Sequence, residues 1–386
     1  MKKRFLRDIA EIQTGPFGSQ LHKEDYVDVG TPIVTVEHLG SRVFSEQNLP
    51  MVSDADKSRL SKYVLKKGDI VFSRVGSVDR CSFVDQKHDG WMFSGRCLRV
   101  RPSEEVEPLF LYYFFCLNAT KEFVRSIAVG ATMPSINTKL LGEVEVVCPG
   151  IEEQRKIADI LSKIDDKIEE NQKINENLQQ QAQALFTQCY EQADVSVPFT
   201  DLIQVLGGGT PKTGEASYWN GEIPFFTPKD VGTPYTLTTE KTITQSGLEH
   251  CNSRLYPVNT VFVTARGTVG KVGLAGVPMA MNQSCYALTG KSISPLLTYH
   301  YTLMTVAHLK HKASGAVFDA IITRDFETET VKKLSDTLAE QFVAVASPIY
   351  ECILNNTLES QRLADLRNAL LPKLMSGELD ASDIEL

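Results

Sequence analysis

The sequence lacks the patterns that would place it in a membrane or an oxidising compartment. No stretch reaches the apolar length needed to span a bilayer, and the basic start MKKRFLRDIAEIQTG is not followed by the apolar run of a secretory signal. The eight cysteines lie far apart and none forms a Cys-x-x-Cys pair, which argues against structural zinc and indicates a reduced setting. We therefore expect a soluble, cytoplasmic protein without a bound metal.

Patterns of catalysis are also missing. The segment GGGTPKTGEASYWNGEIPFF (207–226) is rich in glycine but lacks the P-loop spacing Gly-x-x-x-x-Gly-Lys-[Ser/Thr], and Pro211, which precedes Lys212, offers no N–H. The histidines of HLKH (308–311) lack a third metal ligand at a sensible spacing. No tetrapeptide resembles the Asn-Pro-Pro-Tyr of adenine methyltransferases. We therefore expect a protein that is not an enzyme.

Length and charge indicate several domains that differ in charge. At 386 residues the chain is long enough for two to three domains, and its hydrophobic content of 42% is that of a globular protein. The net charge is −8, but the acidic excess lies in residues 151–193 and 331–386, whereas the remaining parts are close to neutral. The net charge of the whole chain therefore says little about what the near-neutral parts bind.

The same pattern occurs twice along the chain, with an offset that drifts only from 193 to 185. Each repeat is about 190 residues long, far longer than a solenoid unit, and predicts a duplicated domain plus helix related by a pseudo-twofold axis. The matched segments are RDIAEIQTG (7–15) with TDLIQVLGG (200–208), TPIVTVEHLG (31–40) with IPFFTPKDVG (223–232), GDIVFSRVGSVDR (68–80) with NTVFVTARGTVGK (259–271), and GATMPSINTK (130–139) with GAVFDAIITR (315–324).

Each globular part combines short strand-like and helix-like stretches. Apolar runs such as IVFSRV, EVEVVC, TVFVTA and CYALTG are separated by Gly, Pro and Asn turns, which is typical of strands. The patches PLFLYYFFCLNATKEFVRSI and PLLTYHYTLMTVAHLKHKA predict helices. We therefore predict an α+β protein of two tandem α/β domains (1–150 and 194–334), with two long helical segments (151–193 and 335–386).

The two acidic segments carry a coiled-coil pattern. Apolar or small residues recur at 3-4 spacing, and an offset of 185 relates one series to the other, including a polar break in the middle. We expect Pro348 to kink the second helix or mark its start, and Pro372 to end it. The first series is Ile157, Leu161, Ile164, Ile168, Asn171, Asn175, Leu178, Ala182 and Leu185, and the second is Phe342, Ala346, Ile349, Ile353, Asn356, Ser360, Leu363, Arg367 and Leu370.

Two equivalent helices related by a twofold axis pack antiparallel, with their midpoints at the axis. These midpoints are Asn171 and Asn356, which we predict to lie near each other and to fix the register as buried polar residues. The alternative is two amphipathic helices that each pack only on their own domain. A seam over residues 157–185 is roughly 43 Å long and covers about 12–13 base pairs of B-DNA, on the order of one helical turn. This arrangement suits a bipartite DNA target.

Four segments carry a family resemblance. They are TGPFGSQL (14–21), GGGTPKT (207–213), IEEQRKIADILSKIDDKIEENQKINENLQ (151–179) and LRNALLPKLMSGEL (366–379). Through them the chain resembles, over essentially its full length, the specificity subunit of type I restriction–modification systems. The first two resemble the openings of its target-recognition domains, and the last two resemble its central and C-terminal helical regions. The glycine-rich opening differs between the halves, which fits two domains that read different sequences.

The resemblance implies a non-catalytic subunit that recognises DNA. Each target-recognition domain would read half of a split double-stranded DNA site, while the helices would set the spacer and dock two methylation (M) subunits. Those subunits would methylate adenine with S-adenosylmethionine, and restriction (R) subunits using ATP and Mg would join them, so this chain itself would bind no cofactor. The alternative is a two-domain scaffold that binds proteins or glycans and does not read DNA by itself.

Loops that combine glycine, hydroxyl and cationic residues are the first candidate DNA contacts. The paired segments SRVGSVDR (73–80) and TARGTVGK (264–271) align Gly76 with Gly267. Glycine permits close backbone approach, and Arg or Lys suits phosphate or guanine. The alternative is a tight β-turn with solvated charges. The candidates are Arg74, Ser77, Arg80, Arg266, Thr268 and Lys271.

Further candidates come from the opening loops, from a pair of aligned tetrapeptides and from the second half. An acid can accept from cytosine N4, Lys can donate to guanine, Asn or Gln suits adenine, and Trp can stack on a base. The alternatives are surface loops without contact and, for the tryptophan, a core position. The candidates are Gln20, His22 and Lys23 with Thr210, Lys212 and Thr213; Thr35, Glu37 and His38 with Thr227, Lys229 and Asp230; and Asn282, Gln283 and Trp219.

Overall fold

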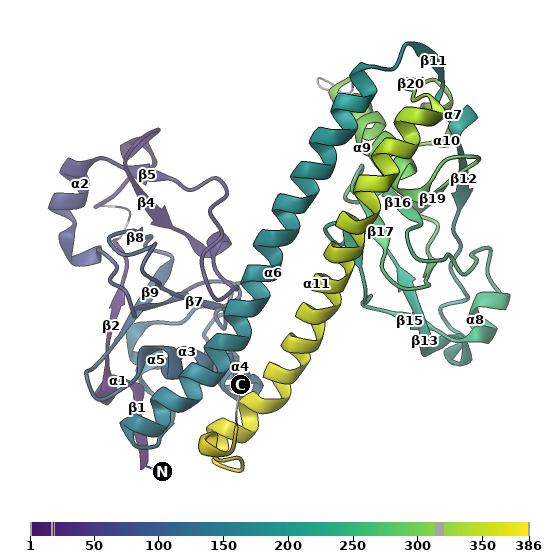
Figure 1. The fold of residues 1–386 in the computed structure, drawn as a ribbon. Helices are drawn as coiled ribbons and strands as arrows, with labels where there is room; N and C mark the ends of the chain where they lie inside the picture. Colours follow the sequence, from purple (N-terminus) through teal and green to yellow (C-terminus); the bar gives the residue numbers. More distant parts are fainter. Residues whose placement is uncertain (1, 17, 19, 313–319, 385–386) are drawn as a thin grey trace. The chain divides into compact units, whose positions relative to one another are not determined.

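The computed structural model describes residues 2–16, 18, 20–312 and 320–384. The chain forms two compact units (Figure 1): unit 1 comprises residues 1–167 and 363–386, and unit 2 comprises residues 168–362. The long helices α6 (Ile151–Glu191) and α11 (Asp336–Ser376) each begin in one unit and continue into the other. Every unit therefore holds a piece of both helices. Within the described part of the chain, no helix is both long enough and apolar enough to cross a membrane.

Unit 1 contains two small sheets and a two-stranded ribbon. The antiparallel central sheet has the strand order β2–β9–β6–β7, and the second sheet has the order β3–β5–β4–β8. The ribbon pairs β1 with β10, which brings the start of the chain against the strand that precedes α6. The strands are β1 (Lys2–Phe5), β2 (Ala10–Thr14), β3 (Tyr26–Val27), β4 (Thr31–Val34), β5 (Met51–Val52), β6 (Ile70–Ser73), β7 (Cys81–Phe83), β8 (Met92–Phe93), β9 (Cys97–Pro102) and β10 (Glu145–Cys148).

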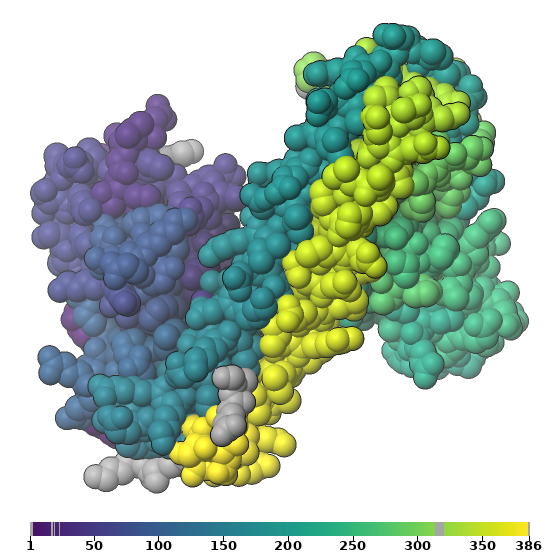
Figure 2. Space-filling model, in the orientation of Figure 1, coloured from purple at the N-terminus to yellow at the C-terminus, as the bar shows by residue number. Residues whose placement is uncertain are grey.

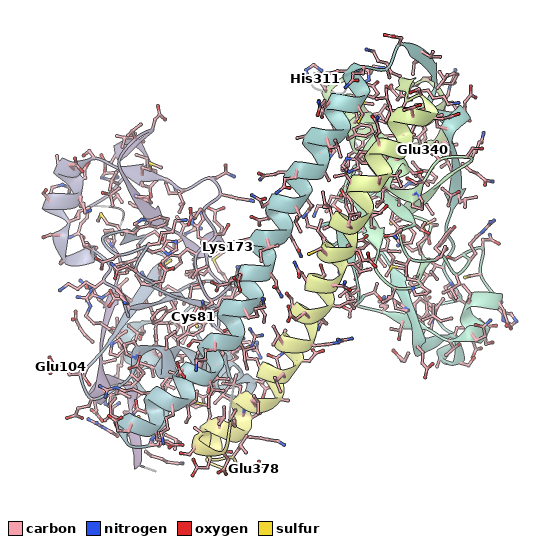
Figure 3. The ribbon with its side chains drawn as sticks, in the orientation of Figure 1. Cys81, Glu104, Lys173, His311, Glu340 and Glu378 are labelled. Carbon is pink, nitrogen blue, oxygen red and sulfur yellow. The ribbon has the colours of Figure 1, made fainter. Side chains whose placement is uncertain are left out.

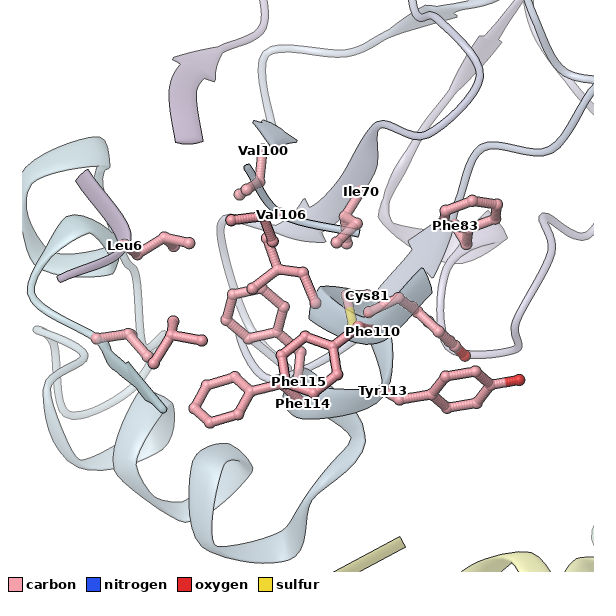
Figure 4. Close-up of a cluster of buried hydrophobic side chains, with 14 of the residues drawn as sticks. Leu6, Ile70, Cys81, Phe83, Val100, Val106, Phe110, Tyr113, Phe114 and Phe115 are labelled. Atoms are coloured by element: carbon pink, nitrogen blue, oxygen red, sulfur yellow. The ribbon is translucent and has the colours of Figure 1, made fainter. Parts of the chain in front are cut away.

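The core of unit 1 forms around helix α3 (Pro108–Cys116), whose sequence PLFLYYFFC is apolar on nearly every side (Figure 4). Phe115 packs edge-on against Phe72 of β6, with ring centroids 4.6 Å apart. Full burial of one such side chain contributes about 1.5–3 kcal/mol, so α3 holds the central sheet firmly. The same cluster includes Leu161 of α6 and Leu374 of α11. The ends of both long helices therefore belong to this core.

Unit 2 repeats the arrangement, with one more strand in the central sheet and one fewer in the second sheet. Its central sheet has the order β12–β19–β16–β17–β14, its second sheet the order β15–β13–β18, and its ribbon pairs β11 with β20. Helix α9 (Pro295–Lys312) takes the place of α3 and the following α4 (Asn118–Ser126). The strands are β11 (Val195–Pro198), β12 (Ile203–Gly207), β13 (Trp219–Phe226), β14 (Tyr235–Thr236), β15 (Thr242–Ile243), β16 (Val261–Thr264), β17 (Val272–Ala275), β18 (Ala280–Met281), β19 (Cys285–Gly290) and β20 (Thr330–Lys333).

The topology confirms the internal duplication and the α+β class. The strand order β2–β9–β6–β7 of unit 1 recurs as β12–β19–β16–β17 in unit 2. The apolar runs of the sequence contain β6, β10, β16 and β19, and the two longer patches form α3 with α4 and α9. Short helices are repeated as well: α1 (Leu6–Ile9) and α5 (Thr138–Gly142) correspond to α7 (Phe199–Leu202) and α10 (Thr323–Glu327).

Within each unit, α6 and α11 pack against each other in antiparallel directions. In unit 2, Asn171 of α6 bonds to Ser360, whereas Phe186, further along α6, contacts Phe342, which is earlier in α11. All positions of the two predicted series are described, and none is exposed. The antiparallel coiled coil is therefore confirmed. The alternative, in which each helix packs only on its own domain, is wrong, although both helices also contribute to the cores of the units.

Asparagines interrupt the apolar seam in unit 2. The Asn171 amide donates to the Asn356 carbonyl oxygen at 3.5 Å, and also to Glu359 at 2.7 Å and Ser360 at 3.3 Å. The Asn356 amide donates to Asn175 Oδ1 at 2.9 Å. Asn171 and Asn356 are therefore neighbours, but the side chains pair in two layers, Asn171 with Ser360 and Asn175 with Asn356. Their role in fixing the register stays a prediction.

Pro348 and Pro372 do not mark the ends of α11, contrary to the expectation from the sequence. The helix begins at Asp336 and ends at Ser376, so Pro348 does not mark its start and Pro372 does not end it. A proline in a helix interior costs about 3 kcal/mol, which burial of neighbouring side chains offsets. Both prolines are exposed. The buried side chains nearest to them in sequence are Ala346, Tyr350, Leu371 and Leu374.

A buried polar group ties the helix pair to the globular body in each unit. In unit 1 the Tyr113 hydroxyl of α3 donates to Asp165 of α6 at 2.7 Å, and Arg367 of α11 pairs with the other carboxylate oxygen. In unit 2 the hydroxyl of Tyr350 on α11 bonds to His300 Nε2 of α9 at 2.9 Å. Offsets of 187 and 185 relate the members of the two pairs. The duplication therefore extends to the points where body and helices are joined.

Candidate nucleic-acid interface

The two first-choice turns, β6–β7 and β16–β17, are the same structure in each unit. Gly76 and Gly267 have φ angles of +75° and +82°, in the left-handed region that glycine adopts without strain. In both turns the residue before the turn donates its backbone N–H to the carbonyl oxygen of the residue after it, at 2.9 Å in the pairs Ser73–Arg80 and Thr264–Lys271. The sequence alignment therefore superposes equivalent turn positions.

The cationic side chains of the two turns differ in solvent exposure and in the hydrogen bonds they already make. Arg80 and Lys271 occupy the same turn position and are both exposed. The Arg80 guanidinium donates to the Leu39 carbonyl oxygen, which leaves other N–H groups of that side chain for a ligand. Arg266 is exposed, whereas Arg74 is half-buried and donates to a backbone carbonyl oxygen at 3.1 Å. That oxygen belongs to Gly95, so Arg74 ties its turn to the connection between β8 and β9.

Each turn lies against the aligned tetrapeptide of its own unit. In unit 2 the Thr268 hydroxyl donates to the Pro228 carbonyl oxygen at 3.0 Å. In unit 1 the bond from Arg80 to Leu39 makes the equivalent connection, because Leu39 directly follows the tetrapeptide 35–38. Ser77 is exposed on its turn. In both halves, the structure therefore brings the candidates of the turn together with those of the tetrapeptide.

The tetrapeptides TVEH and TPKD share one local hydrogen bond. The Thr35 N–H donates to His38 Nδ1 at 3.0 Å, and the Thr227 N–H donates to Asp230 Oδ2 at 2.8 Å. Because Nδ1 of His38 accepts, the proton of the neutral ring lies on Nε2, which is 3.1 Å from a backbone carbonyl oxygen. The Asp230 carboxylate also accepts from the Thr227 hydroxyl at 2.6 Å and from the Glu240 N–H at 2.8 Å.

His38 and Asp230 therefore help to shape their loops, and their contact with DNA stays a prediction. His38 is only 2% exposed, and its ring nitrogens are engaged within the loop. Asp230 is half-buried, and its carboxylate accepts three hydrogen bonds within the loop. Between each threonine and its acceptor, Glu37 and Lys229 are exposed at matched positions. Glu37 accepts from the Thr35 hydroxyl at 3.0 Å and the Lys229 ammonium lies 3.6 Å from Glu240, but both side chains are exposed enough to meet a base.

The glycine-rich opening of unit 2 is explained by close packing of the backbone. A Cβ at Gly208 would lie 2.2 Å from the Asn282 carbonyl oxygen, so no larger residue fits. The Thr210 hydroxyl donates to the side-chain oxygen of Gln283, which joins the opening loop to the segment containing Asn282 and Gln283. Asn282 itself uses its side-chain oxygen to accept the Ser284 N–H at 3.0 Å. Gly208 and Gly209, whose Cβ would lie 2.6 Å from the Asn252 backbone nitrogen, thus serve close packing.

Trp219 joins this surface but is partly engaged inside the protein. Its indole N–H donates to the Lys212 carbonyl oxygen at 3.2 Å, and its ring packs edge-on against Phe225 at 5.6 Å. The Lys241 ammonium lies 5.7 Å from the ring centroid. Lys212 and Thr213 are exposed beside it. Stacking of Trp219 on a base therefore stays a prediction for a half-buried ring.

The opening loop of unit 1 is described only in part. Gln20 accepts a hydrogen bond from the Tyr63 hydroxyl at 2.7 Å, and the backbone N–H of exposed His22 donates to Asp25 at 2.6 Å. The backbone of Lys23 lies in the short helix η1 (Lys23–Asp25). Residues 17 and 19 lie outside the described residues. A Cβ at Gly15 would lie 2.1 Å from the Ser94 carbonyl oxygen, which matches the close packing at Gly208.

The described residues contain no group of three or more His, Cys, Asp or Glu side chains that could hold a metal ion. Burial raises the pKa of the Cys97 thiol to about 12, despite hydrogen bonds from Ser94 that lower it. Burial likewise raises the pKa of Cys285 to about 12. Both thiols therefore stay protonated near neutral pH and are poor nucleophiles.

Arg125 lies beside the first turn and was missed in the sequence. It projects from α4 and pairs with Asp79 at 2.7 Å. Together with Pro134 and residues 76–80 of the turn, it lines a pocket of about 480 Å³. The repeated segment nearest to Arg125 in the sequence is 130–139. It has no pattern of charged residues that would indicate a binding site, so Arg125 was not identified.

Comparison with known proteins assigns the duplicated units to a family. The family model of the type I restriction modification DNA specificity domain matches residues 1–180 and 195–332, which covers most of the chain. The chain belongs to this family. Among its relatives, the HindI specificity subunit of Haemophilus influenzae is 24% identical over 83% of this chain and 88% of the relative. The MjaIX specificity subunit of Methanocaldococcus jannaschii is 23% identical over 98% of this chain and 93% of the relative.

A solved structure of this family shares the fold. The S subunit of a type I restriction–modification system from M. genitalium matches with a TM-score of 0.60 at 14% sequence identity, covering 97% of this chain and 95% of that chain. At this identity the match supports the architecture. For a specificity-family chain, units 1 and 2 are accordingly the two repeated recognition domains, each with its portion of the coiled coil.

Proposed function

We propose that this chain is the non-catalytic DNA-recognition subunit of a type I restriction–modification complex, and that each half reads one part of a bipartite double-stranded site. The observation that supports the proposal is the duplicated turn. In both units an exposed cation, Arg80 or Lys271, occupies the same position of a hairpin built on a positive-φ glycine. A scaffold for unrelated partners needs no such matched cations. Family membership over both halves supports the same role.

The two halves present different chemistry at matched positions, as the reading of two unlike half-sites requires. The exposed residue of the tetrapeptide is Glu37 in unit 1 and Lys229 in unit 2. A glutamate accepts from cytosine N4, whereas a lysine donates to the acceptors of guanine. The turns differ too, because Arg266 has no cationic counterpart at the aligned position, Val75. The matched backbone would position the halves, and these side chains would distinguish the sequences.

The long helices would set the spacer and dock the partners. Figure 2 shows α6 in teal and α11 in yellow with one side of each helix open to solvent. Lys173 on α6 and Glu340 on α11 are exposed (Figure 3). We propose that two methylation subunits dock on the helices and carry S-adenosylmethionine, and that restriction subunits carry ATP and Mg. Such a complex would act in the cytoplasm.

The salt dependence of DNA binding tests this proposal against the scaffold alternative. Phosphate contacts release counterions, so the binding constant for duplex DNA should fall steeply as salt rises, with a slope set by the number of contacts. The measurement uses the full chain, alone and assembled with its methylation subunits. A binding constant that does not change with salt would favour the scaffold.

Methylation provides two further tests. Mapping of adenine methylation in cells with and without the gene should reveal a two-part motif that disappears when the gene is removed, and an unchanged methylation pattern would contradict the role. The purified chain with S-adenosylmethionine and DNA should produce no methylated adenine. Turnover by the chain alone would instead indicate an enzyme with a site that the described residues do not reveal.

A further inference from the structure

A short loop beside the cationic turn of unit 1 exposes two apolar side chains. Val129 and Met133 are both 63% exposed. Apolar side chains gathered at one place on a surface commonly mark a contact region, whereas single scattered ones need no explanation. The recognition role described above makes no use of these residues.

The loop is held in one conformation. Val129 and Ser135 exchange backbone hydrogen bonds of 2.9 and 2.8 Å across its base. Gly130 has a φ angle of +109°, and a Cβ at this position would lie 2.8 Å from the Met133 carbonyl oxygen. The tight closure requires glycine. Met133 is therefore presented near the tip of a closed hairpin, which reduces the conformational entropy lost when it binds a partner.

The loop is joined to the candidate DNA-binding turn. The Gly76 N–H donates to the Pro134 carbonyl oxygen at 2.8 Å, and the Ile136 N–H donates to the Arg74 carbonyl oxygen at 2.9 Å. Pro134 and Gly76 both line the pocket of about 480 Å³ described above. Loop, turn and pocket therefore form one continuous surface.

The pocket carries a net positive charge. Its charged lining residues are Arg80, Arg125 and Asp79, and the Asp79 carboxylate pairs with Arg125 at 2.7 Å. A guanidinium has five N–H donors, so both arginines keep donors after the hydrogen bonds they make within the protein. Phosphate is the ligand that such a pair of donors suits. Proteins that grip a duplex also place apolar side chains such as Met and Pro against its bases.

We propose, resting on the DNA-recognition role, that residues 129–135 and the arginine-lined pocket form one contact with duplex DNA. Arg80 and Arg125 hold a backbone phosphate at the pocket, while Met133 and Val129 press against the sugars and base edges of the adjacent nucleotides. The aligned segment of the second half, GAVF (315–318), carries Phe where the first half has Met133. That segment lies outside the described residues, so the proposal concerns unit 1.

Two kinds of substitution separate the phosphate contact from the apolar contact. The full chain, assembled with its methylation subunits, is titrated with a mixed-sequence DNA duplex over a series of salt concentrations. Arg125→Gln should reduce the steepness of the salt dependence by about one ion. Met133→Ala should weaken binding by about three- to tenfold at every salt concentration without changing the slope, because it removes only apolar contact. Met133→Lys should make the slope steeper by about one ion, because it adds a cation at the duplex.

Matched controls and foldedness decide the outcome. Arg7→Gln removes another exposed arginine of unit 1 that is paired with a carboxylate, Glu143, and Val195→Ala removes a side chain that is 62% exposed on β11. Both controls should bind like the unaltered chain, and all variants should keep its thermal melting temperature. If the loop and pocket variants behave like the controls while the unaltered chain remains salt-dependent, the loop proposal is overturned and the recognition role stands. Salt-independent DNA binding by the unaltered chain would contradict both the loop proposal and the recognition role.

Discussion

The arginines of this protein have different roles, which depend on their burial and on the hydrogen bonds that they make within the protein. Arg99 is 2% exposed and bonds to Glu11 at 2.6 Å, which links strands β9 and β2 of the central sheet. Arg74 is half-buried and bonds to the Gly95 carbonyl oxygen in the connection between β8 and β9. Arg266 is exposed, and only its backbone N–H is described as bonded, to the Ser284 carbonyl oxygen at 3.3 Å. Of the three, Arg266 has the side chain best placed to meet DNA.

Arg266→Ala should therefore weaken DNA recognition in one of two ways. If Arg266 reads a guanine, the loss should be about 1–3 kcal/mol and confined to one base position. If it holds a phosphate, binding should weaken at all sequences and the salt slope should fall by about one. Binding to a library of duplexes measures both effects, with Lys333→Ala, an exposed cation on β20, as the matched control. No change in either quantity would remove Arg266 from the interface.

His300 should make the stability of unit 2 depend on pH. Burial lowers its pKa from 6.5 to about 3, and its ring faces the neutral side chains of Gln183 and Tyr350. Below about pH 6.5 the unfolded chain takes up a proton that the folded state does not, so stability falls with acidification by up to about 1.4 kcal/mol per pH unit. The loss is complete only near the folded pKa of about 3.

The test compares urea unfolding of the parent chain and His300→Gln from about pH 7 to pH 5, above the range where most carboxylates titrate. Trp219 fluorescence in a Trp91→Phe background reports unit 2, because the chain contains only two tryptophans. The variant should lose part of the pH dependence between these limits. Equal dependence in both proteins would show that His300 is not the titrating group.

At the residue scale, the sequence predicted positions better than roles. Gly76 and Gly267 were found because a turn that requires positive φ leaves glycine in both copies. The capping roles of His38 and Asp230 could not be read in this way. Their additional partners are Gln47 and Glu240, nine and ten residues further on, and only the path of the folded loop brings these residues together. Arg125 was hidden for the same reason, since Asp79 is 46 residues away.

At the scale of elements, the seam was predictable because its period is local. A 3-4 spacing places side chains on one face of any helix, so the sequence predicted which residues of α6 and α11 would be covered. The ends of α11 were not predictable from the positions of Pro348 and Pro372, because burial against the body and the partner helix outweighs the lost hydrogen bonds. The joins between body and helices were equally hidden. Tyr113 and Asp165 lie 52 residues apart and meet only after packing.

Tyr113→Phe should destabilise unit 1 because it removes a hydrogen bond to a buried carboxylate. Burial and the neighbouring Asp165 raise the pKa of the Tyr113 hydroxyl, which therefore remains a donor. Loss of a hydrogen bond to a charged group costs about 1.5–3 kcal/mol. Urea unfolding followed by Trp91 fluorescence, in a Trp219→Phe background, measures the change. Tyr26→Phe on β3 is the matched control, and an effect no larger than the control's would show that the bond is dispensable.

Cysteine pairs test the register of the helices in unit 2. The layers Asn175–Asn356 and Asn171–Ser360 predict that cysteines at 175 and 356, or at 171 and 360, are joined by a short thiol cross-linker. The exposed Cys352 is first replaced by serine. Cysteines at 171 and 349 serve as the out-of-register control. Cross-linking of the control pair at the same rate would show that the seam slides.

At the scale of the whole molecule, composition and packing divide the chain at different places. Composition changes near residue 150, where the acidic heptads begin. By contacts, unit 1 continues to residue 167 and includes residues 363–386, because both helices contribute side chains to its core. Duplication of domain plus helix therefore yields two units that exchange helix segments. A chain built in this way couples each recognition body to both helices, and the joins at Asp165 and Tyr350 fix that coupling within each unit.

If the helices set the spacer, their length should determine the spacer without altering what each half reads. Seven residues in the seam pattern, inserted at matched points of α6 and α11, add about 10.5 Å of helix, or about three base pairs at 3.4 Å each. Methylation mapping in cells that carry this variant should return the same half-site sequences with a longer spacer. Insertion into α6 alone should abolish recognition, because it leaves the two seam series unmatched. A changed half-site with an unchanged spacer would show instead that the helices influence base reading and do not measure distance.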